Sequence, residues 1–206
     1  MRLFVALEIP RQTRDALAGL IAQLAPTCRG ARWSRPEGMH LTLKFIGEVP
    51  SEKAANIRAE LRAVDRFFPL EIAFRGAGFF PNARHPRVFW AGVEAGAALA
   101  ALASGIERRL EPLGIAREAR EFRPHLTLAR FKSEEGLPAL HAALAKLEKG
   151  SSAVSGLGMD FGRGTFEEFH LIESKLHPQG ATYITLETFR FAADERGNSA
   201  TDGARA

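Results

Sequence analysis

Two short segments of the sequence pair a histidine with a threonine two residues later. The first is His40-Leu41-Thr42-Leu43, and the second, 85 residues further on, is His125-Leu126-Thr127-Leu128. In a chain of 206 residues with six histidines, chance alone would rarely give two such pairs. The repeat therefore marks both segments as candidates for chemistry.

Both segments have the pattern of a β-strand, in which successive side chains point to opposite faces. His40 and Thr42 then share one face, as do His125 and Thr127, while the leucines beside them share the other. Because leucines belong in a core, each segment would present an imidazole and a hydroxyl side by side on a rigid support. Two such strands facing each other would make a cleft with four polar groups.

Two imidazoles and two hydroxyls, with no cysteine among them, suit in-line displacement at phosphorus. One neutral histidine takes a proton from an attacking water, and the other, protonated, gives a proton to the leaving oxygen. An imidazole pKa of about 6.5 makes both forms accessible near neutral pH. The threonine hydroxyls would donate hydrogen bonds to the non-bridging phosphoryl oxygens. On these residues alone, either histidine could fill either role.

The residues after each motif are further candidates for substrate contact. Arg130 could bind phosphate, but strict alternation from His125 puts its side chain on the leucine face, so that only a β-bulge would turn it toward the cleft. Lys44 follows the first motif, and a solvated charge is the default expectation for it. Three aromatic residues could stack on a base, although core packing is the commoner role of an aromatic: Trp33, Phe45 and Phe122.

The remaining polar clusters give weaker signals. Arg117, Arg120 and Arg123 alternate with glutamates, which is typical either of a surface that guides RNA or of an ordinary mixed-charge surface. Four histidines lack a threonine two residues later and are expected to be structural: His85, His141, His170 and His177. No compact Cys/His/Asp spacing supports a metal, and Gly76-Ala77-Gly78 lacks the lysine and hydroxyl of a phosphate-binding loop. We expect no metal and no cofactor.

Hydrophobic periodicity predicts alternating strands and helices that position these residues. Strands or extended segments are expected at 3–9, 31–47, 70–74, 88–93, 125–131, 154–161, 166–174 and 183–191, and helices at 17–24, 50–64, 99–113 and 137–147. Gly76, Gly78 and the stretch 81–86 predict a loop. The order strand, helix, extended segment, helix, strand recurs from about Val88, which indicates a duplicated α/β unit. Small polar residues over 195–206 predict a flexible tail.

Composition sets broad limits. With 206 residues, 46% of them hydrophobic and 25% charged, the chain has a globular composition and can fold without a metal or a disulfide. Cys28 is its single cysteine, so no intramolecular disulfide can form, which suits a reducing compartment. The apolar run from Leu3 to Leu7 is too short for a signal peptide or a membrane span, so we expect a cytoplasmic protein. A net charge of +4 favours anionic partners.

With these motifs, the sequence resembles the two-histidine phosphoesterase superfamily. The N-terminal Arg2-Leu3-Phe4-Val5-Ala6-Leu7, the extension Lys44-Phe45-Ile46-Gly47-Glu48-Val49 and the approach Phe122-Arg123-Pro124 are similar to its RNA 2′,3′-cyclic phosphodiesterase branch, also known for 2′-5′ RNA ligation. The resemblance runs from about Met1 to Phe191. It implies an α+β, bilobal fold, with two pseudo-symmetric α/β lobes and antiparallel sheets around a central cleft, in a single domain over 1–194.

The resemblance also implies roles for the site residues. His40 would be the proton donor, His125 the proton acceptor, and Thr42 and Thr127 phosphate ligands, with a 2′-phosphate as product. The partner would be RNA with a 2′,3′-cyclic phosphate terminus, tRNA fragments included, with no membrane and no obligate protein partner. Three alternatives stay open: a small cyclic phosphate on a nucleotide or sugar as substrate, 2′-5′ ligation by the same residues, and a non-catalytic RNA-binding module.

Overall fold

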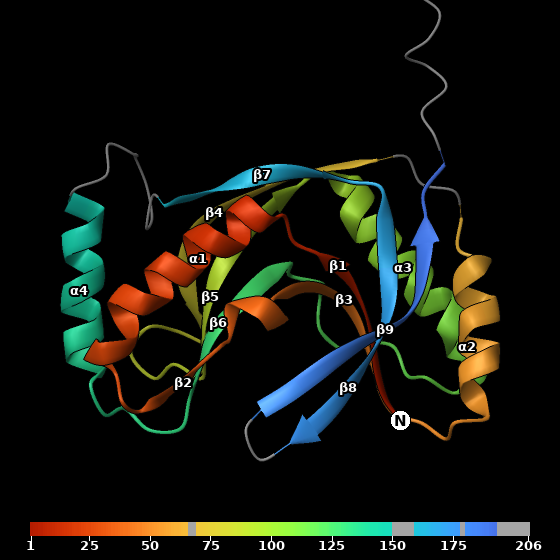
Figure 1. The fold of residues 1–206 in the computed structure, drawn as a ribbon, viewed down its shortest axis with the longest axis horizontal. Coiled ribbons are helices and arrows are strands. Elements are labelled where there is room, and N and C mark those ends of the chain that lie inside the picture. Colours follow the sequence, from red (N-terminus) through yellow and green to blue (C-terminus); the bar gives the residue numbers. More distant parts are fainter. Residues whose placement is uncertain (66–68, 150–158, 178–179, 193–206) are drawn as a thin grey trace, which may run out of the picture.

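The computed structural model describes residues 1–65, 69–149, 159–177 and 180–192, which form two antiparallel sheets (Figure 1). The first sheet has the strand order β3-β1-β8-β9, and its strands are β1 (Arg2–Glu8), β3 (His40–Glu48), β8 (Glu168–His177) and β9 (Gly180–Arg190). The second sheet has the order β2-β6-β5-β4-β7, and its strands are β2 (Ala31–Trp33), β4 (Leu70–Phe80), β5 (Val88–Ala95), β6 (His125–Phe131) and β7 (Asp160–Phe166). This is the expected α+β fold with a motif strand in each sheet.

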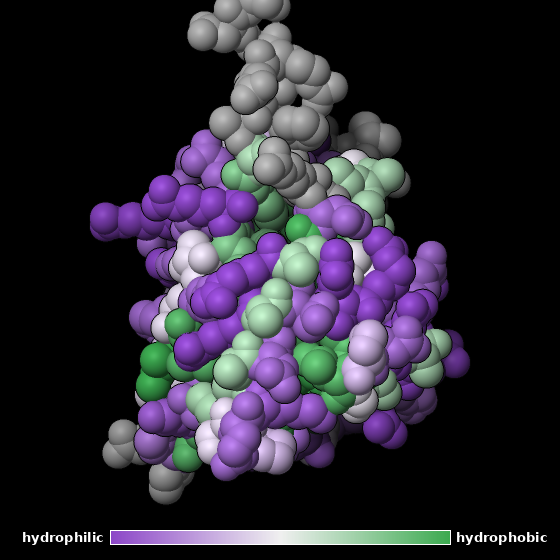
Figure 2. Space-filling model, turned by 90° about the vertical axis from the view of Figure 1, so that its right-hand side faces the viewer, coloured by the Kyte–Doolittle hydropathy of each residue, from purple (hydrophilic) through white to green (hydrophobic). Residues whose placement is uncertain are grey.

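Each sheet is covered by a pair of helices. α2 (Lys53–Arg62) and α3 (Ala97–Leu110) pack on the first sheet, whereas α1 (Arg11–Leu24) and α4 (Leu137–Lys149) pack on the second (Figure 1). In α3 the apolar residues Leu99, Leu102 and Ile106 recur at helical spacing and are buried. The face of the molecule on the side of α2 and α3 is mostly hydrophilic, as Figure 2 shows. Short 3-10 turns follow α1 (Ala25–Thr27) and α3 (Glu111–Leu113), and another (Pro36–Gly38) precedes β3.

The duplication expected from the sequence is present in the strand order, but the halves of the chain are not the lobes. The order β3-β1-β8-β9 corresponds to β6-β5-β4-β7, with β2 as an additional edge strand. The chain crosses between lobes: β4 comes from the first half and joins the second sheet, and β8 and β9 return to the first. Likewise, α1 follows a strand of the first sheet yet packs on the second. Each lobe therefore combines segments from both halves of the chain, because each half completes the other half's sheet.

Two predicted elements are corrected. The loop expected at Gly76 and Gly78 is part of β4, because Gly76 takes a φ of 69° at a bulge and Gly78 leaves room for the ring of Trp90. The extended stretch 31–47 is two strands separated by a 3-10 turn. The strand expected at 154–161 lies mostly outside the described residues, and β7 begins at Asp160. The predicted tail at 195–206 also lies outside them.

One hydrophobic core joins the helices to both sheets. All four motif leucines are buried in it, as the alternating pattern predicts: Leu41, Leu43, Leu126 and Leu128. Their side chains fix the two motif strands from behind, so the histidine and threonine side chains are held on the opposite face. Among the helices of the described residues, none is long and apolar enough to cross a bilayer.

Candidate active site

The two motif strands meet at one cleft. β3 in the first sheet contacts β6 in the second, and the cleft between them has a volume of about 2920 Å³. His40, Thr42, His125 and Thr127 all line it. The structure therefore brings together the four polar groups that the sequence singled out, one imidazole and one hydroxyl from each lobe.

Both imidazoles are held in the same way. His40 Nδ1 lies 2.8 Å from the carbonyl oxygen of Gly38, and His125 Nδ1 lies 2.7 Å from that of Arg123. A carbonyl oxygen only accepts hydrogen bonds, so Nδ1 carries the proton in each ring. Nε2 is then the ring nitrogen left for chemistry, a proton acceptor in the neutral imidazole and a proton donor in the imidazolium. The backbone two residues before each histidine thus sets its tautomer.

The surroundings of the two imidazoles differ. The His40 ring packs against Phe4 and Tyr183, with centroids 4.5 Å and 5.0 Å away, and this burial lowers the pKa of His40 to about 4 although the Gly38 carbonyl opposes the shift. Within the described residues, His125 has one aromatic neighbour of this kind, Phe80, whose ring meets it edge-on at 5.2 Å. The neutral form is therefore strongly favoured at His40 in the free protein. Sequence reasoning missed these three aromatic neighbours, because they lie on other strands.

A β-bulge interrupts each motif strand at the same position. On β3 the pairing with β1 skips Leu43, and on β6 the pairing with β5 skips Leu128. Two consecutive residues therefore point into the core after each threonine, and the next residue points to the cleft. Arg130 is exposed and lines the cleft for this reason. The β-bulge that Arg130 needs in order to face the cleft is therefore present. Phe45 occupies the equivalent place on β3 and is 53% exposed.

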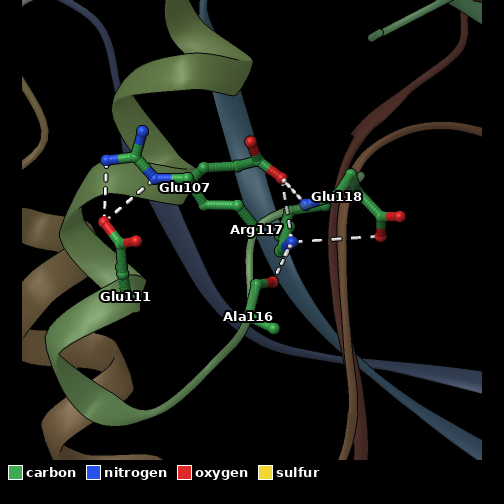
Figure 3. Close-up of polar contacts among 6 residues, drawn as sticks. Glu107, Glu111, Ala116, Arg117 and Glu118 are labelled. Atoms are coloured by element: carbon green, nitrogen blue, oxygen red, sulfur yellow. Dashed lines mark hydrogen bonds and ion pairs between the residues drawn. The ribbon is translucent and has the colours of Figure 1, made fainter. Parts of the chain in front are cut away.

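Lys44 does not have the solvated charge expected for it. The bulge turns it inward, leaving the residue 2% exposed, and its Nζ donates hydrogen bonds to Glu107 Oε1 at 2.9 Å and to the Ala116 carbonyl at 2.6 Å. Glu118 lies 3.9 Å from Nζ, and its backbone amide also donates to Glu107 (Figure 3). Burial would raise the pKa of Glu107, but these hydrogen bonds outweigh it and hold that pKa below its ordinary value. Lys44 thus ties β3 to α3 and to the segment that leads to the second motif.

The other predicted contacts divide between core and cleft. Trp33 and Phe122 border the cleft but pack partly against the core, and the Trp33 indole nitrogen donates to the Cys28 carbonyl. Arg117 pairs with Glu111 (Figure 3), and Arg123 pairs with Glu121. Arg120 lines the cleft and has no ion pair among the described residues. Arg117 and Arg123 therefore have the ion pairs of a mixed-charge surface, while Arg123 and Arg120 both line the cleft.

The other four histidines lie in contacts that differ from those of the motifs. His85 is bonded to Glu134, His170 to Thr188 and His177 to Thr182, each through a side chain. His141 packs edge-on against Phe79. Within the described parts of the chain, no group of three or more His, Cys, Asp or Glu residues is arranged to hold a metal ion.

Comparison with known proteins gives one consistent family. The model of the LigT-like phosphoesterases matches residues 7–90 and, separately, residues 92–183. A protein of Archaeoglobus fulgidus named RNA 2′,3′-cyclic phosphodiesterase is 35% identical over 189 residues, covering 92% of this chain and 99% of its own. A protein of Aeropyrum pernix with the same name is 38% identical over 184 residues, covering 87% and 97%. A crystal structure from Thermus thermophilus matches with a TM-score of 0.73 at 33% identity, covering 93% of this chain and 98% of that one.

Proposed function

Since the chain belongs to the LigT-like phosphoesterase family, we propose that it is an RNA 2′,3′-cyclic phosphodiesterase, an enzyme that opens cyclic phosphates at RNA 3′ ends to give 2′-phosphomonoesters. The observation that carries the proposal is the pair of imidazoles in one cleft, each with Nδ1 bonded to a backbone carbonyl and Nε2 left for proton transfer. The relatives named for this activity, 35% and 38% identical over most of the chain, support the substrate.

In the proposed reaction, a water attacks phosphorus as the bond to the ribose 3′ oxygen breaks. His125 Nε2 accepts the proton of the water, and His40 Nε2–H donates a proton to the 3′ oxygen, in the roles implied by the family resemblance. The new P–O bond and the retained 2′ ester give the 2′-phosphate and a free 3′ hydroxyl. Thr42 and Thr127 donate hydrogen bonds to the non-bridging oxygens, where charge develops. These steps use only groups of this chain and require no metal.

The donor role of His40 depends on the substrate. With a pKa lowered to about 4 by burial, its ring is neutral in the free protein at neutral pH. A bound phosphate places negative charge beside the ring, which favours the imidazolium and raises its pKa. Binding of the substrate would therefore favour uptake of a proton from solvent by His40, which then acts as the acid. The alternative assignment, with His40 as the base, would need no such change.

A chelator-treated assay tests the function and its metal independence together. The substrate is a short RNA ending in a 2′,3′-cyclic phosphate, and chromatography resolves the 2′- and 3′-monophosphate products. We expect conversion to the 2′-phosphate by the wild type, with losses of about 10²–10⁴-fold in His40→Ala and in His125→Ala. Retention of wild-type activity in either variant would contradict the mechanism. Loss of activity with chelator, restored by added metal, would contradict metal independence alone.

The same cleft could also serve RNA ligation. Attack on the cyclic phosphate by a 5′ hydroxyl of a second RNA, in place of water, would form a 2′-5′ linkage with the same proton transfers. Adding a 5′-hydroxyl RNA fragment, such as a tRNA half, to the assay measures this directly. A ligated product lost in both histidine variants would add ligation to the proposed hydrolysis, and salt-dependent RNA binding without any product would instead favour a binding module.

A further inference from the structure

The strand β2 breaks the correspondence between the two lobes. Among the described strands the first sheet has no counterpart to it, because β3 is an edge strand there whereas β6 is covered by Ala31–Trp33. Ser34 fixes the end of β2 to the second motif: its amide donates to the Leu128 carbonyl and its hydroxyl to the Thr127 carbonyl, both at 2.8 Å. The strand that carries the second motif is therefore extended sideways by β2, which adds to the cleft wall on that side.

This extension places two arginines side by side. Arg32 on β2 is the register partner of Arg130 on β6, and directly opposed residues on neighbouring strands point to the same face. Both side chains are exposed, and both line the cleft that contains His125 and Thr127. Because neighbouring strands are about 4.8 Å apart, the two guanidinium groups can reach one shared ligand.

The two arginines lack a protein partner. Like charges directly opposed on a sheet are destabilising, and among the residues that the structure describes neither guanidinium has an ion pair. The acidic side chains that border the cleft are Glu37, Glu107, Glu118 and Glu121. Three of them are already paired, two with Lys44 and one with Arg123. An anionic ligand would remove the repulsion between Arg32 and Arg130.

The opposite wall has a different character. Phe45 and Tyr183, which come from the first sheet, are 53% and 42% exposed in the same cleft. Exposed rings on one wall and unpaired arginines on the other suit single-stranded nucleic acid, whose bases stack on aromatic side chains while its phosphates contact basic ones.

We propose that Arg32, together with Arg130, binds the phosphodiester that links the last two nucleotides of the substrate, so that the preferred substrate is an oligonucleotide rather than a cyclic mononucleotide. This inference rests on the proposed function, which puts the cyclic phosphate between the two motifs. Thr127 and Arg130 are three positions apart on β6, about 7–10 Å at the rise of a strand, so the arginines lie beyond the reacting phosphate. Planar guanidinium groups bind phosphate oxygens in pairs, which suits a diester with two free oxygens.

The test compares two substrates and two arginine variants. The substrates are a 2′,3′-cyclic mononucleotide and an oligoribonucleotide ending in the same nucleotide. Arg32→Ala should lower kcat/KM on the oligonucleotide about tenfold and leave the mononucleotide within about twofold. It should also flatten the dependence of log KM for the oligonucleotide on log salt by about 0.7, the value for one phosphate contact on a single strand. Arg32→Lys should recover part of the loss.

The matched control is Arg163→Ala. Arg163 is exposed on β7, the other edge of the same sheet, and is not among the residues that line the cleft, so the variant loses the same charge elsewhere. We expect it to leave both substrates unchanged. An Arg32→Ala variant that affects both substrates equally, or neither, would overturn the second phosphate site.

A binding measurement separates this inference from the proposed function. Fluorescence anisotropy with a labelled oligouridylate carrying a 2′-phosphate end needs no turnover. If the wild type hydrolyses neither substrate, the proposed function fails, and the binding comparison then decides the site. Weaker binding by Arg32→Ala than by Arg163→Ala supports the phosphate site, and equal binding by the two variants overturns it.

Discussion

The two motif strands are nearly identical up to their bulges and differ after them. On β3 and β6, a histidine held by the carbonyl two residues earlier is followed by a threonine and by a bulged leucine. The next residue points into the core, where β3 has a paired lysine and β6 has Ala129, fully buried and uncharged. The residue after that reaches the cleft, as a phenylalanine on β3 and as an arginine on β6.

This contrast separates what duplication supplies from what it does not. A repeated strand places two chemically equivalent groups on facing walls, but acid and base catalysis require one histidine to be protonated and the other not. The difference must come from the surroundings, and here His40 is packed between two aromatic rings whereas His125 has one as a neighbour. The two lobes therefore contribute the same reacting groups, but the residues that surround the two histidines differ.

The largest effect is expected from removing both reacting groups. His40→Ala and His125→Ala should each lower kcat by about 10²–10⁴-fold, and the double variant should lose little more than the more damaged single variant. The reason is that both histidines act in one displacement, which fails when either is missing. Single-turnover rates on the cyclic-phosphate RNA measure this. Losses that multiply in the double variant would indicate that the two motifs act independently.

The buried lysine should give the largest effect on stability. Lys44→Met leaves the Glu107 carboxylate without its ion-pair partner, with the Glu118 amide still donating to it, in a site where the side chain of Glu107 is 21% exposed. We therefore expect a loss of about 3 kcal/mol in the free energy of unfolding, near the lower end for a broken buried pair. Urea denaturation measures it. The double variant Lys44→Met/Glu107→Gln removes the uncompensated charge and should recover part of the loss. A double variant less stable than Lys44→Met would contradict this account.

Much of the site could be predicted because it depends on local pattern. The period of two put His40 with Thr42 and buried the leucines, and the repeat identified the pair, because strand geometry and burial follow from a few adjacent residues. The helices followed in the same way from apolar spacing. The match of the family model to residues 7–90 and 92–183 is consistent with the repeat found in the sequence.

The features that sequence reasoning missed depend on residues far apart in the chain. The bulges at Leu43 and Leu128 decide whether Arg130 faces the cleft and Lys44 the core, and strict alternation along a strand does not predict them. A buried lysine at this position depends on Glu107 and Ala116, more than 60 residues away. The exchange of strands between lobes likewise depends on pairing that periodicity does not encode. In retrospect, the run of two buried-type residues, Leu128-Ala129, before a charged residue could have indicated the bulge on β6.

The residues that follow the bulges should have moderate and different effects. Phe45→Ala should raise KM for the RNA about tenfold, within the range for loss of one stacked base, with a salt dependence like that of the wild type. Arg130→Ala should raise KM by a similar factor and weaken its salt dependence, because a phosphate contact is lost. Steady-state kinetics at several salt concentrations separate the two. The same change of salt dependence in both variants would mean that the walls of the cleft do not differ in the proposed way.

The smallest effect concerns the packing that distinguishes the two histidines. Removing the ring beside His40 with Tyr183→Ala should raise the pKa of His40 from about 4 part of the way toward its ordinary 6.5, while Tyr183→Phe keeps the ring and should leave it near 4. NMR titration of the imidazole resonances measures both variants. A wild-type His40 that titrates near 6.5 would contradict the role of burial.

The burial of His40 should also make the free energy of unfolding depend on pH below about 6.5. Between pH 6.5 and about 4 the unfolded chain binds a proton at His40 that the folded chain does not. The free energy of unfolding should therefore fall as the pH falls through this range, and His40 should not contribute to its pH dependence above it. In Tyr183→Ala the folded pKa lies closer to the unfolded one, so the fall attributable to His40 should be smaller than in Tyr183→Phe. Equal pH dependence in these two variants would show that the ring of Tyr183 does not set the pKa of His40, and that the asymmetry between the two histidines arises from Phe4 or from the strand itself.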